Sequence, residues 1–343
     1  MKNNIILLAL IGALVTACGS GSSNSSTTPQ TPAQQFATNI TSKSAQVANS
    51  AQSISTAAFL TNTPSAYLLT ASNSDASKQY LYYFNDVNWQ QYQLTFESST
   101  FITLAMTYSN NIIYLGGYSN VSGMERAQLY SYQNGTTKLV ESNPYLTNCN
   151  NYCYINALTA SSDGSSIYVS GVDDSGIEIY EYNNGKWIEL PSAPRSSESA
   201  IIKGQTTFLL GVNALTVDVN NNLYLGAAFG AYKGPYEGYL AKFTNGSWVQ
   251  ESLPQQFSWS VNGLTYTNNQ VYASGINPIS SGADYSILSF YNTQWNQLYG
   301  YTISESSQYY SPAGIYSDTY GNIYSLINQN GARQVLVLSV PAQ

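Results

Sequence analysis

The side chains that most often do chemistry are scarce in this chain of 343 residues. There is no histidine, which excludes Ser-His-Asp and Cys-His catalytic sites, His-ligated zinc or haem, and a histidine switch near neutral pH. Only 8% of the residues are charged, with 11 Lys and Arg against 18 Asp and Glu, so we expect no binding of nucleic acid. No phosphate-binding or dinucleotide-binding glycine motif occurs, and we expect no cofactor.

Three aspartates stand at matching places in the chain, Asp163, Asp218 and Asp318. The segment 218–222 has the oxygen-rich start of a calcium loop. Such a loop needs a glutamate at its twelfth position, and that position here is Phe229. We therefore interpret the three aspartates as turn residues, whose carboxylates bond nearby backbone N–H groups, and we expect no metal site.

Cys18 ends a segment with its own chemistry. Lys2 precedes an unbroken run of apolar and small residues at 5–15, which is too short to span a bilayer because spanning takes roughly 20 residues. The run ends in Val15-Thr16-Ala17-Cys18, which resembles the bacterial lipobox. That resemblance implies cleavage before Cys18, acylation of Cys18 and, with Gly19 next, sorting to the outer membrane. The alternative is an ordinary secretory signal with a chance cysteine.

The other two cysteines form a close pair, Cys149 and Cys153. An exported chain with one such pair is expected to oxidise it to a disulfide. A zinc site would need a second pair or histidines, and a redox motif would have two intervening residues rather than three.

Composition divides the chain into three parts. Residues 1–17 are the predicted lipoprotein signal peptide. Residues 18–50 hold the lipidated cysteine and a stretch rich in Gly, Ser, Thr, Asn, Pro and Gln, which we expect to be a flexible tether. Residues 51–343 are the predicted folded domain.

The folded domain contains an internal repeat of about fifty residues. Its central tyrosines stand at 67, 114, 168, 224, 272 and 324, and an outer tryptophan stands at 89, 187, 248 and 295. Each copy predicts four alternating strands joined by tight turns, with Asn-Gly pairs at 134–135, 184–185 and 245–246. The repeat therefore predicts an all-β fold, a six-bladed β-propeller of four-stranded antiparallel blades, with the repeated aromatic residues in its packing. A solenoid is the competing architecture.

The second copy carries a family resemblance. Residues 112–117, with their paired glycines, are followed by Leu129-Tyr130, which resembles the kelch repeat and implies a propeller over residues 57–340. Six-bladed sialidases are a further resemblance, because they use three arginines and this chain has three, Arg126, Arg195 and Arg333. The segment after Asp163 lacks the Thr-Trp of the sialidase repeat, so we expect no enzyme activity.

The long connections between strands two and three, and between blades, all fall on one face of the predicted disc. Loops on a rigid scaffold are where binding concentrates, and Tyr, Trp and Arg dominate protein contacts. We predict the ligand site on this face, formed by Tyr118, Arg126, Arg195, Phe229, Tyr232, Lys233, Tyr236, Phe257, Trp259, Tyr285, Tyr309 and Tyr310. The expected function is protein binding or scaffolding at the bacterial envelope, with glycan binding as the alternative and sialidase-like hydrolysis as a third, less favoured one.

The last repeat ends after its third strand, which would leave an open sheet edge. We expect residues within 45–56 to pair there as the outer strand of the last blade and so to close the ring.

Overall fold

A computed structural model describes residues 29–48, 52–60, 63–140, 153–173, 176–191, 200–202, 205–230, 236–257, 259–279, 282–291, 294–304, 314–329 and 332–339. The chain divides into two units, Met1–Thr31 and Pro32–Gln343, and the fold described below belongs to the second. None of the described helices has the length and apolar character needed to cross a membrane.

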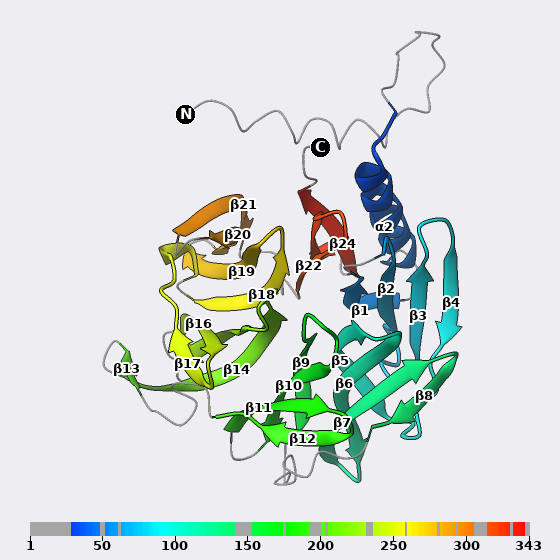
Figure 1. The fold of residues 1–343 in the computed structure, drawn as a ribbon, viewed down its shortest axis with the longest axis horizontal. Helices are drawn as coiled ribbons and strands as arrows, with labels where there is room; N and C mark the ends of the chain where they lie inside the picture. The colour runs from blue at the N-terminus through cyan, green and yellow to red at the C-terminus, as the bar shows by residue number, and fades with distance from the viewer. Residues whose placement is uncertain are drawn as a thin grey trace. The chain divides into compact units, whose positions relative to one another are not determined.

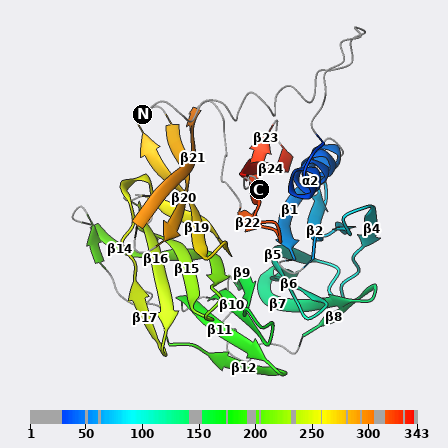
Figure 2. The ribbon, with the colours of Figure 1, turned by 45° about the horizontal axis from the view of Figure 1, so that its top comes forward.

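Six antiparallel sheets form the six blades of a β-propeller, as predicted (Figures 1 and 2). Blade 1 contains β1 (Gln52–Phe59), β2 (Ala66–Ser72), β3 (Gln79–Phe84) and β4 (Trp89–Gln93), and blade 2 contains β5 (Phe101–Ser109), β6 (Ile112–Val121), β7 (Met124–Gln133) and β8 (Thr136–Leu139). Blade 3 contains β9 (Tyr154–Ala160), β10 (Ser166–Asp173), β11 (Gly176–Asn183) and β12 (Lys186–Glu189), and blade 4 contains β13 (Ala200–Ile202), β14 (Gln205–Val217), β15 (Leu223–Gly230), β16 (Tyr236–Thr244) and β17 (Ser247–Gln250). Blade 5 contains β18 (Ser260–Thr267), β19 (Gln270–Ile279), β20 (Gly282–Tyr291) and β21 (Gln294–Ser304), and blade 6 contains β22 (Ile315–Ser317), β23 (Ile323–Gln329) and β24 (Ala332–Ser339).

The innermost strands of the blades surround a common axis. Strands β1, β5, β9, β14, β18 and β22 contact one another in that order, and β22 returns to β1, so the ring is closed. Each blade is a hairpin meander, and its Asn-Gly turns have the backbone that the sequence predicted, with φ of 51° and 83° at Asn134 and Gly135.

At one position of the second strand in blades 2 and 4, the next blade approaches too closely for any side chain larger than that of glycine. A Cβ atom at Gly116 would lie 2.5 Å from Cγ2 of Ile155 in the next blade, and one at Gly226 would lie 2.6 Å from Cγ1 of Val261. Serines occupy the same place in blades 3 and 5, as Ser170 and Ser274. Blade packing therefore explains why small residues recur at the second strand.

Tryptophans of the outer strands bond the segment that connects their blade to the preceding one. This confirms the packing role predicted for them. Trp248 Nε1 donates a hydrogen bond of 2.8 Å to the Pro191 carbonyl, and Trp295 Nε1 donates one of 2.9 Å to the Ser252 carbonyl. These equivalent bonds bridge blades 3 and 4 and blades 4 and 5.

Helix α2 (Pro32–Ala48) corrects two expectations. This part of the chain was predicted to be a flexible tether, and residues 45–56 were predicted to supply an outer strand to blade 6. Blade 6 instead has three described strands, and α2 packs against its outermost one, β24. Residues 52–56 belong to β1, the inner strand of blade 1.

The helix covers the edge of β24 through one hydroxyl. Ser44 is fully buried, its Oγ lies 3.1 Å from the Val335 carbonyl oxygen, and it accepts a bond of 3.1 Å from the Val335 N–H. These are the two backbone groups that a fourth strand would pair. Asn322 Nδ2 donates to the Ala33 carbonyl at the other end of the helix.

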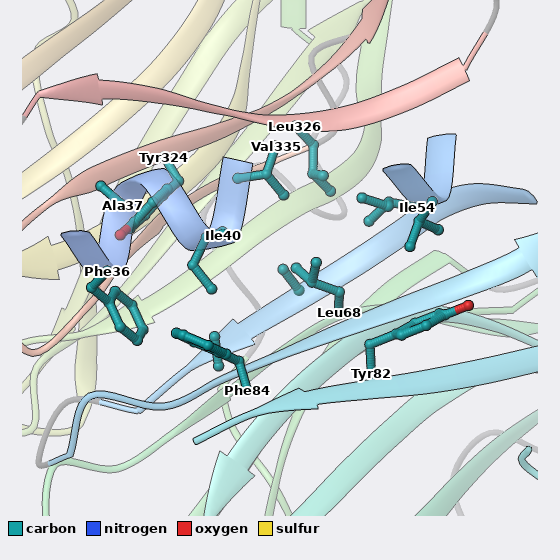
Figure 3. Close-up of a cluster of buried hydrophobic side chains, with 13 residues drawn as sticks. Phe36, Ala37, Ile40, Ile54, Leu68, Tyr82, Phe84, Tyr324, Leu326 and Val335 are labelled. Carbon is teal, nitrogen blue, oxygen red and sulfur yellow. The ribbon is translucent and has the colours of Figure 1, made fainter. Parts of the chain in front are cut away.

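The apolar side of α2 fills the space between blades 6 and 1. Phe36 and Ile40 are fully buried and lie against Phe84 and Leu68 of blade 1 and Tyr324 of blade 6 (Figure 3). The Phe36 and Phe84 rings are 5.4 Å apart. The ring is therefore closed by a helix in the place of a strand.

Candidate ligand-binding cavity

The described residues line an open cavity of about 530 Å³ on the axis of the ring. It lies where the inner strands end and turn into the second strands. Its lining comes from all six blades, residues 57–60, 106–110, 158–164, 215–219, 264–267 and 315–319. Sites of small ligands commonly have volumes of about 300–1,000 Å³, so the cavity has the size of a binding site.

Five of the six inner strands contain a β-bulge at equivalent positions. One residue of each strand is skipped in the pairing with the second strand, namely Ser55, Leu104, Asn156, Asn213 and Asn262. The cavity lining begins two residues after each of them. Because a bulge bends a strand and increases its twist, these bulges fix how the strand ends surround the cavity.

The rim of the cavity is tied together from blade to blade. Ser109 Oγ and Asn110 Nδ2 of blade 2 both donate 2.7 Å bonds to the Gly164 carbonyl of blade 3. Ser162 of blade 3 donates from its N–H and its hydroxyl to Asn221 Oδ1 of blade 4, at 2.9 and 2.7 Å. These bonds preorganise the turns, which reduces the cost of ordering them on binding.

Blade 6 is joined to its neighbours in the same way. Thr265 and Ser317 share a hydrogen bond of 2.8 Å between their hydroxyls, and Thr56 and Tyr316 share one of 3.4 Å.

Two of the three aspartates at the cavity accept hydrogen bonds within their own turns through both carboxylate oxygens, as predicted for turn residues. Asp318 Oδ1 accepts from the N–H groups of Tyr320 and Asn322, and its Oδ2 accepts from Asn322 Nδ2 at 2.7 Å and Tyr324 Oη at 2.5 Å. Burial raises the pKa of the Asp318 carboxyl above its usual range. Asp218 makes the same set of bonds within blade 4.

Asp163 differs from the other two because one of its oxygens is open. Its Oδ1 accepts from the Ser161 hydroxyl, the Ser165 hydroxyl and the Ser165 N–H, and these bonds lower the pKa of the carboxyl to about 2. No group in the described part of the chain bonds its Oδ2. The residue is exposed, so a charged oxygen faces solvent at the cavity.

Further hydrogen-bonding groups stand around the axis. Thr107, Thr159 and Thr216 line the cavity, and their hydroxyls have no hydrogen-bond partner among the described residues. Among the described strands, the inner strands β1, β5, β9, β18 and β22 pair on one side only. Their other edges therefore leave backbone N–H and C=O groups near the axis without a strand partner, and side chains bond some of them, as Ser317 Oγ bonds the Tyr266 carbonyl.

Aromatic rings complete the lining. Tyr108 and Tyr266 occupy matching places in blades 2 and 5, and each hydroxyl donates to the asparagine three residues on, Asn111 and Asn269, at 2.7 and 3.4 Å. Burial raises the pKa of Tyr108, so the phenol is uncharged at neutral pH. No group of three or more Asp, Glu or Cys among the described residues is arranged to hold a metal ion.

Two of the residues predicted to form a site on the long-loop face are buried. Phe257, in the short helix Gln255–Phe257, is 1% exposed and packs edge-on against Trp295 at 5.5 Å. Tyr285 is fully buried and bonds Ser325 of blade 6 at 3.0 Å. Both aromatic side chains are part of the core and are not exposed on the surface where a ligand would bind.

The other predicted site residues have varied positions. Tyr118 and Arg126 lie near one end of the adjacent strands β6 and β7, and Trp259 is half-buried just before β18. Phe229 lies in β15 and Tyr236 in β16, but the structure does not describe their side chains. Five predicted site residues lie outside the described residues: Arg195, Tyr232, Lys233, Tyr309 and Tyr310. Because the turns of a meander alternate between its ends, the cavity lies at the opposite end of the strands from this face.

The structure describes one of the three cysteines. Cys153 is buried beside the start of β9, whereas Cys18 and Cys149 lie outside the described residues. Lipidation and the Cys149–Cys153 disulfide stay predictions.

Sequence reasoning singled out the three aspartates of the lining as turn residues and did not identify the other residues that line the cavity. The repeat includes a small residue, a large one and a threonine, as in 157–159 and 214–216.

Comparison with known proteins supports the fold. No protein-family model and no curated protein matches the chain. The lectin SapL1, crystallised with alpha methyl fucoside, is similar with a TM-score of 0.53 and 10% identity, over 85% of this chain and 97% of that one. AofleA from Arthrobotrys oligospora matches at 0.47 and 12%, over 84% and 88%, and the nidogen/laminin complex at 0.49 and 9%, over 74% and 81%. At these identities the likeness is one of fold.

Proposed function

We propose that this protein is a non-enzymatic binding module that takes its ligand at the axial cavity. The observation that carries the proposal is the lining itself, in which open polar groups from several blades meet in one preorganised space. The lining, as far as the structure describes it, contains no Glu, Cys, Lys or Arg. Its most buried carboxylates, Asp218 and Asp318, are held by their own turns. Hydrolysis of the sialidase kind would need arginines, and none is among the described residues that line the cavity.

Two exposed valines at the same end of the ring allow a matched test. Val219 lies at the cavity and is 60% exposed, whereas Val87, in the turn between β3 and β4, is 77% exposed and does not line it. Val219→Glu places a longer, charged side chain at the opening. We expect it to weaken ligand binding about tenfold or more, because an unpaired charge would be desolvated by the ligand. Val87→Glu should leave binding unchanged.

Binding is measured by surface plasmon resonance, with the immobilised protein exposed to protein and polysaccharide fractions of a bacterial envelope. A fraction retained by the wild type and by Val87→Glu, and lost by Val219→Glu, supports the proposal. Equal retention by all three proteins would contradict it.

The lipobox resemblance leads us to place this module at the outer membrane, held by acyl chains on Cys18. Cys18→Ala removes the thiol that accepts the acyl group, so the chain should stay an uncleaved precursor and should leave the detergent phase on Triton X-114 partition. A Cys18→Ala protein that still partitions into detergent would exclude lipid anchoring. Tyr118 and Arg126, at the other end of the strands, remain our candidates for a protein contact.

A further inference from the structure

We infer that the axial cavity accepts a neutral, polyhydroxylated ligand of the carbohydrate class, such as a terminal sugar of a glycan. This inference rests on the proposed function, since it names the ligand class of the same cavity. Three properties of the lining carry it: its charge, its hydrogen-bonding groups and its apolar surfaces.

The charge of the lining excludes anionic ligands. Among the described lining residues, Asp163, Asp218 and Asp318 are the ones with ionisable carboxyls, and no Lys or Arg lies among them. A phosphate, sulfate or carboxylate brought into this space would be repelled by the carboxylates and would find no Lys or Arg to pair with. Acidic sugars, nucleotides and phospholipid headgroups are therefore disfavoured.

The hydrogen-bonding groups match hydroxyls. Asp163 Oδ2 is an open acceptor held in place by the three bonds to Oδ1. Thr107, Thr159 and Thr216 add hydroxyls that both donate and accept, and the strand edges add backbone donors and acceptors. A sugar carries donors and acceptors on every face and can satisfy such a set. A wholly apolar ligand would leave these groups desolvated and unpaired, at a cost for each one.

The apolar surfaces suit the C–H faces of a sugar ring. Tyr108 and Tyr266 line the cavity, and Val219 is an exposed aliphatic side chain at its edge. Flat, rigid aromatic rings provide contact area at little entropic cost. The lining is thus amphipathic in the way that a sugar is.

A protonated amine is the ligand class that could compete for Asp163. It would pair with the open carboxylate oxygen but would leave the threonine hydroxyls without partners. Binding of an amine would be strongly weakened by salt, whereas binding of a neutral sugar would not.

The experiment uses the full mature chain on an array of neutral, sialylated and sulfated glycans, followed by titration calorimetry with a neutral glycan that binds. Asp163→Asn should weaken binding about tenfold, because it removes a charge-assisted hydrogen bond. Asp75→Asn is the matched control. Asp75 Oδ1 accepts from the Ser77 N–H and hydroxyl as Asp163 does from Ser165, but it does not line the cavity.

Binding to neutral glycans that is insensitive to salt, weakened by Asp163→Asn and unchanged by Asp75→Asn, supports the inference. Binding only to acidic glycans, or to no glycan while Val219→Glu still abolishes retention of an envelope fraction, overturns the sugar class and leaves the cavity as the site. If Val219→Glu changes no binding at all, the proposed function itself fails.

Discussion

A chain that begins at Ala51, and so lacks α2, is expected to lose most of its stability and to aggregate. Phe36 and Ile40 are fully buried and Val47 nearly so, and burying a side chain of this size contributes about 1.5–3 kcal/mol. Losing the three therefore costs about 5 kcal/mol or more, which is comparable with the whole stability of many domains. The loss also exposes the edge of β24, where Ser44 now bonds Val335, and open edges promote association between chains.

The control is a chain that begins at Pro29, which retains the whole helix. We expect it to melt at the same temperature as a chain that begins at Cys18, in thermal unfolding followed by circular dichroism. Equal melting temperatures for the chains that begin at Ala51 and Pro29 would mean that α2 does not close the ring.

Asp318→Ala is expected to cost about 3 kcal/mol or more, measured by urea denaturation. The carboxylate is 3% exposed and accepts four hydrogen bonds, so its removal leaves buried donors unpaired. A buried donor without a partner costs about 1–3 kcal/mol. Asp163→Ala, at an exposed turn of the same kind, should cost much less because water replaces the lost acceptor. Similar losses for both variants would contradict the buried network.

The raised pKa of Asp318 adds a pH dependence. A carboxyl whose pKa is higher in the folded chain contributes stability that is fully present below its unfolded value of 3.8 and is lost as the pH rises through the folded value. The difference in unfolding free energy between wild type and Asp318→Asn should therefore shrink as the pH is raised from below 3.8. A difference that grows with pH would contradict the raised pKa.

Local patterns were enough to predict the blades. The alternating strands and the Asn-Gly turns depend on residues close together in the chain, and both were found where they were predicted. The helix was missed although Ala33, Phe36, Ala37, Ile40 and Val47 lie at helical spacing. The residues between them are mostly Ser, Thr, Asn and Gln, several of them weak helix formers. Packing on blades 1 and 6 stabilises this helix, and local propensity does not reveal such packing.

The cavity could not be located from local patterns. Its lining comes from six segments spread over residues 57–319, and only ring closure brings them together. Loop length and aromatic content favoured the other face instead. On that face, however, the large aromatic rings of Phe257 and Tyr285 are buried in the core.

Hydrogen exchange with and without the retained envelope fraction tests the central claim most directly, because it compares the two ends of the ring in one experiment. If the axial cavity is the ligand site, the fraction should slow exchange in segments 106–110, 158–164 and 215–219, which line the cavity. Exchange in 118–126 and 252–257 should stay unchanged. Protection confined to 118–126 and 252–257 would place the ligand on the long-loop face and contradict this account.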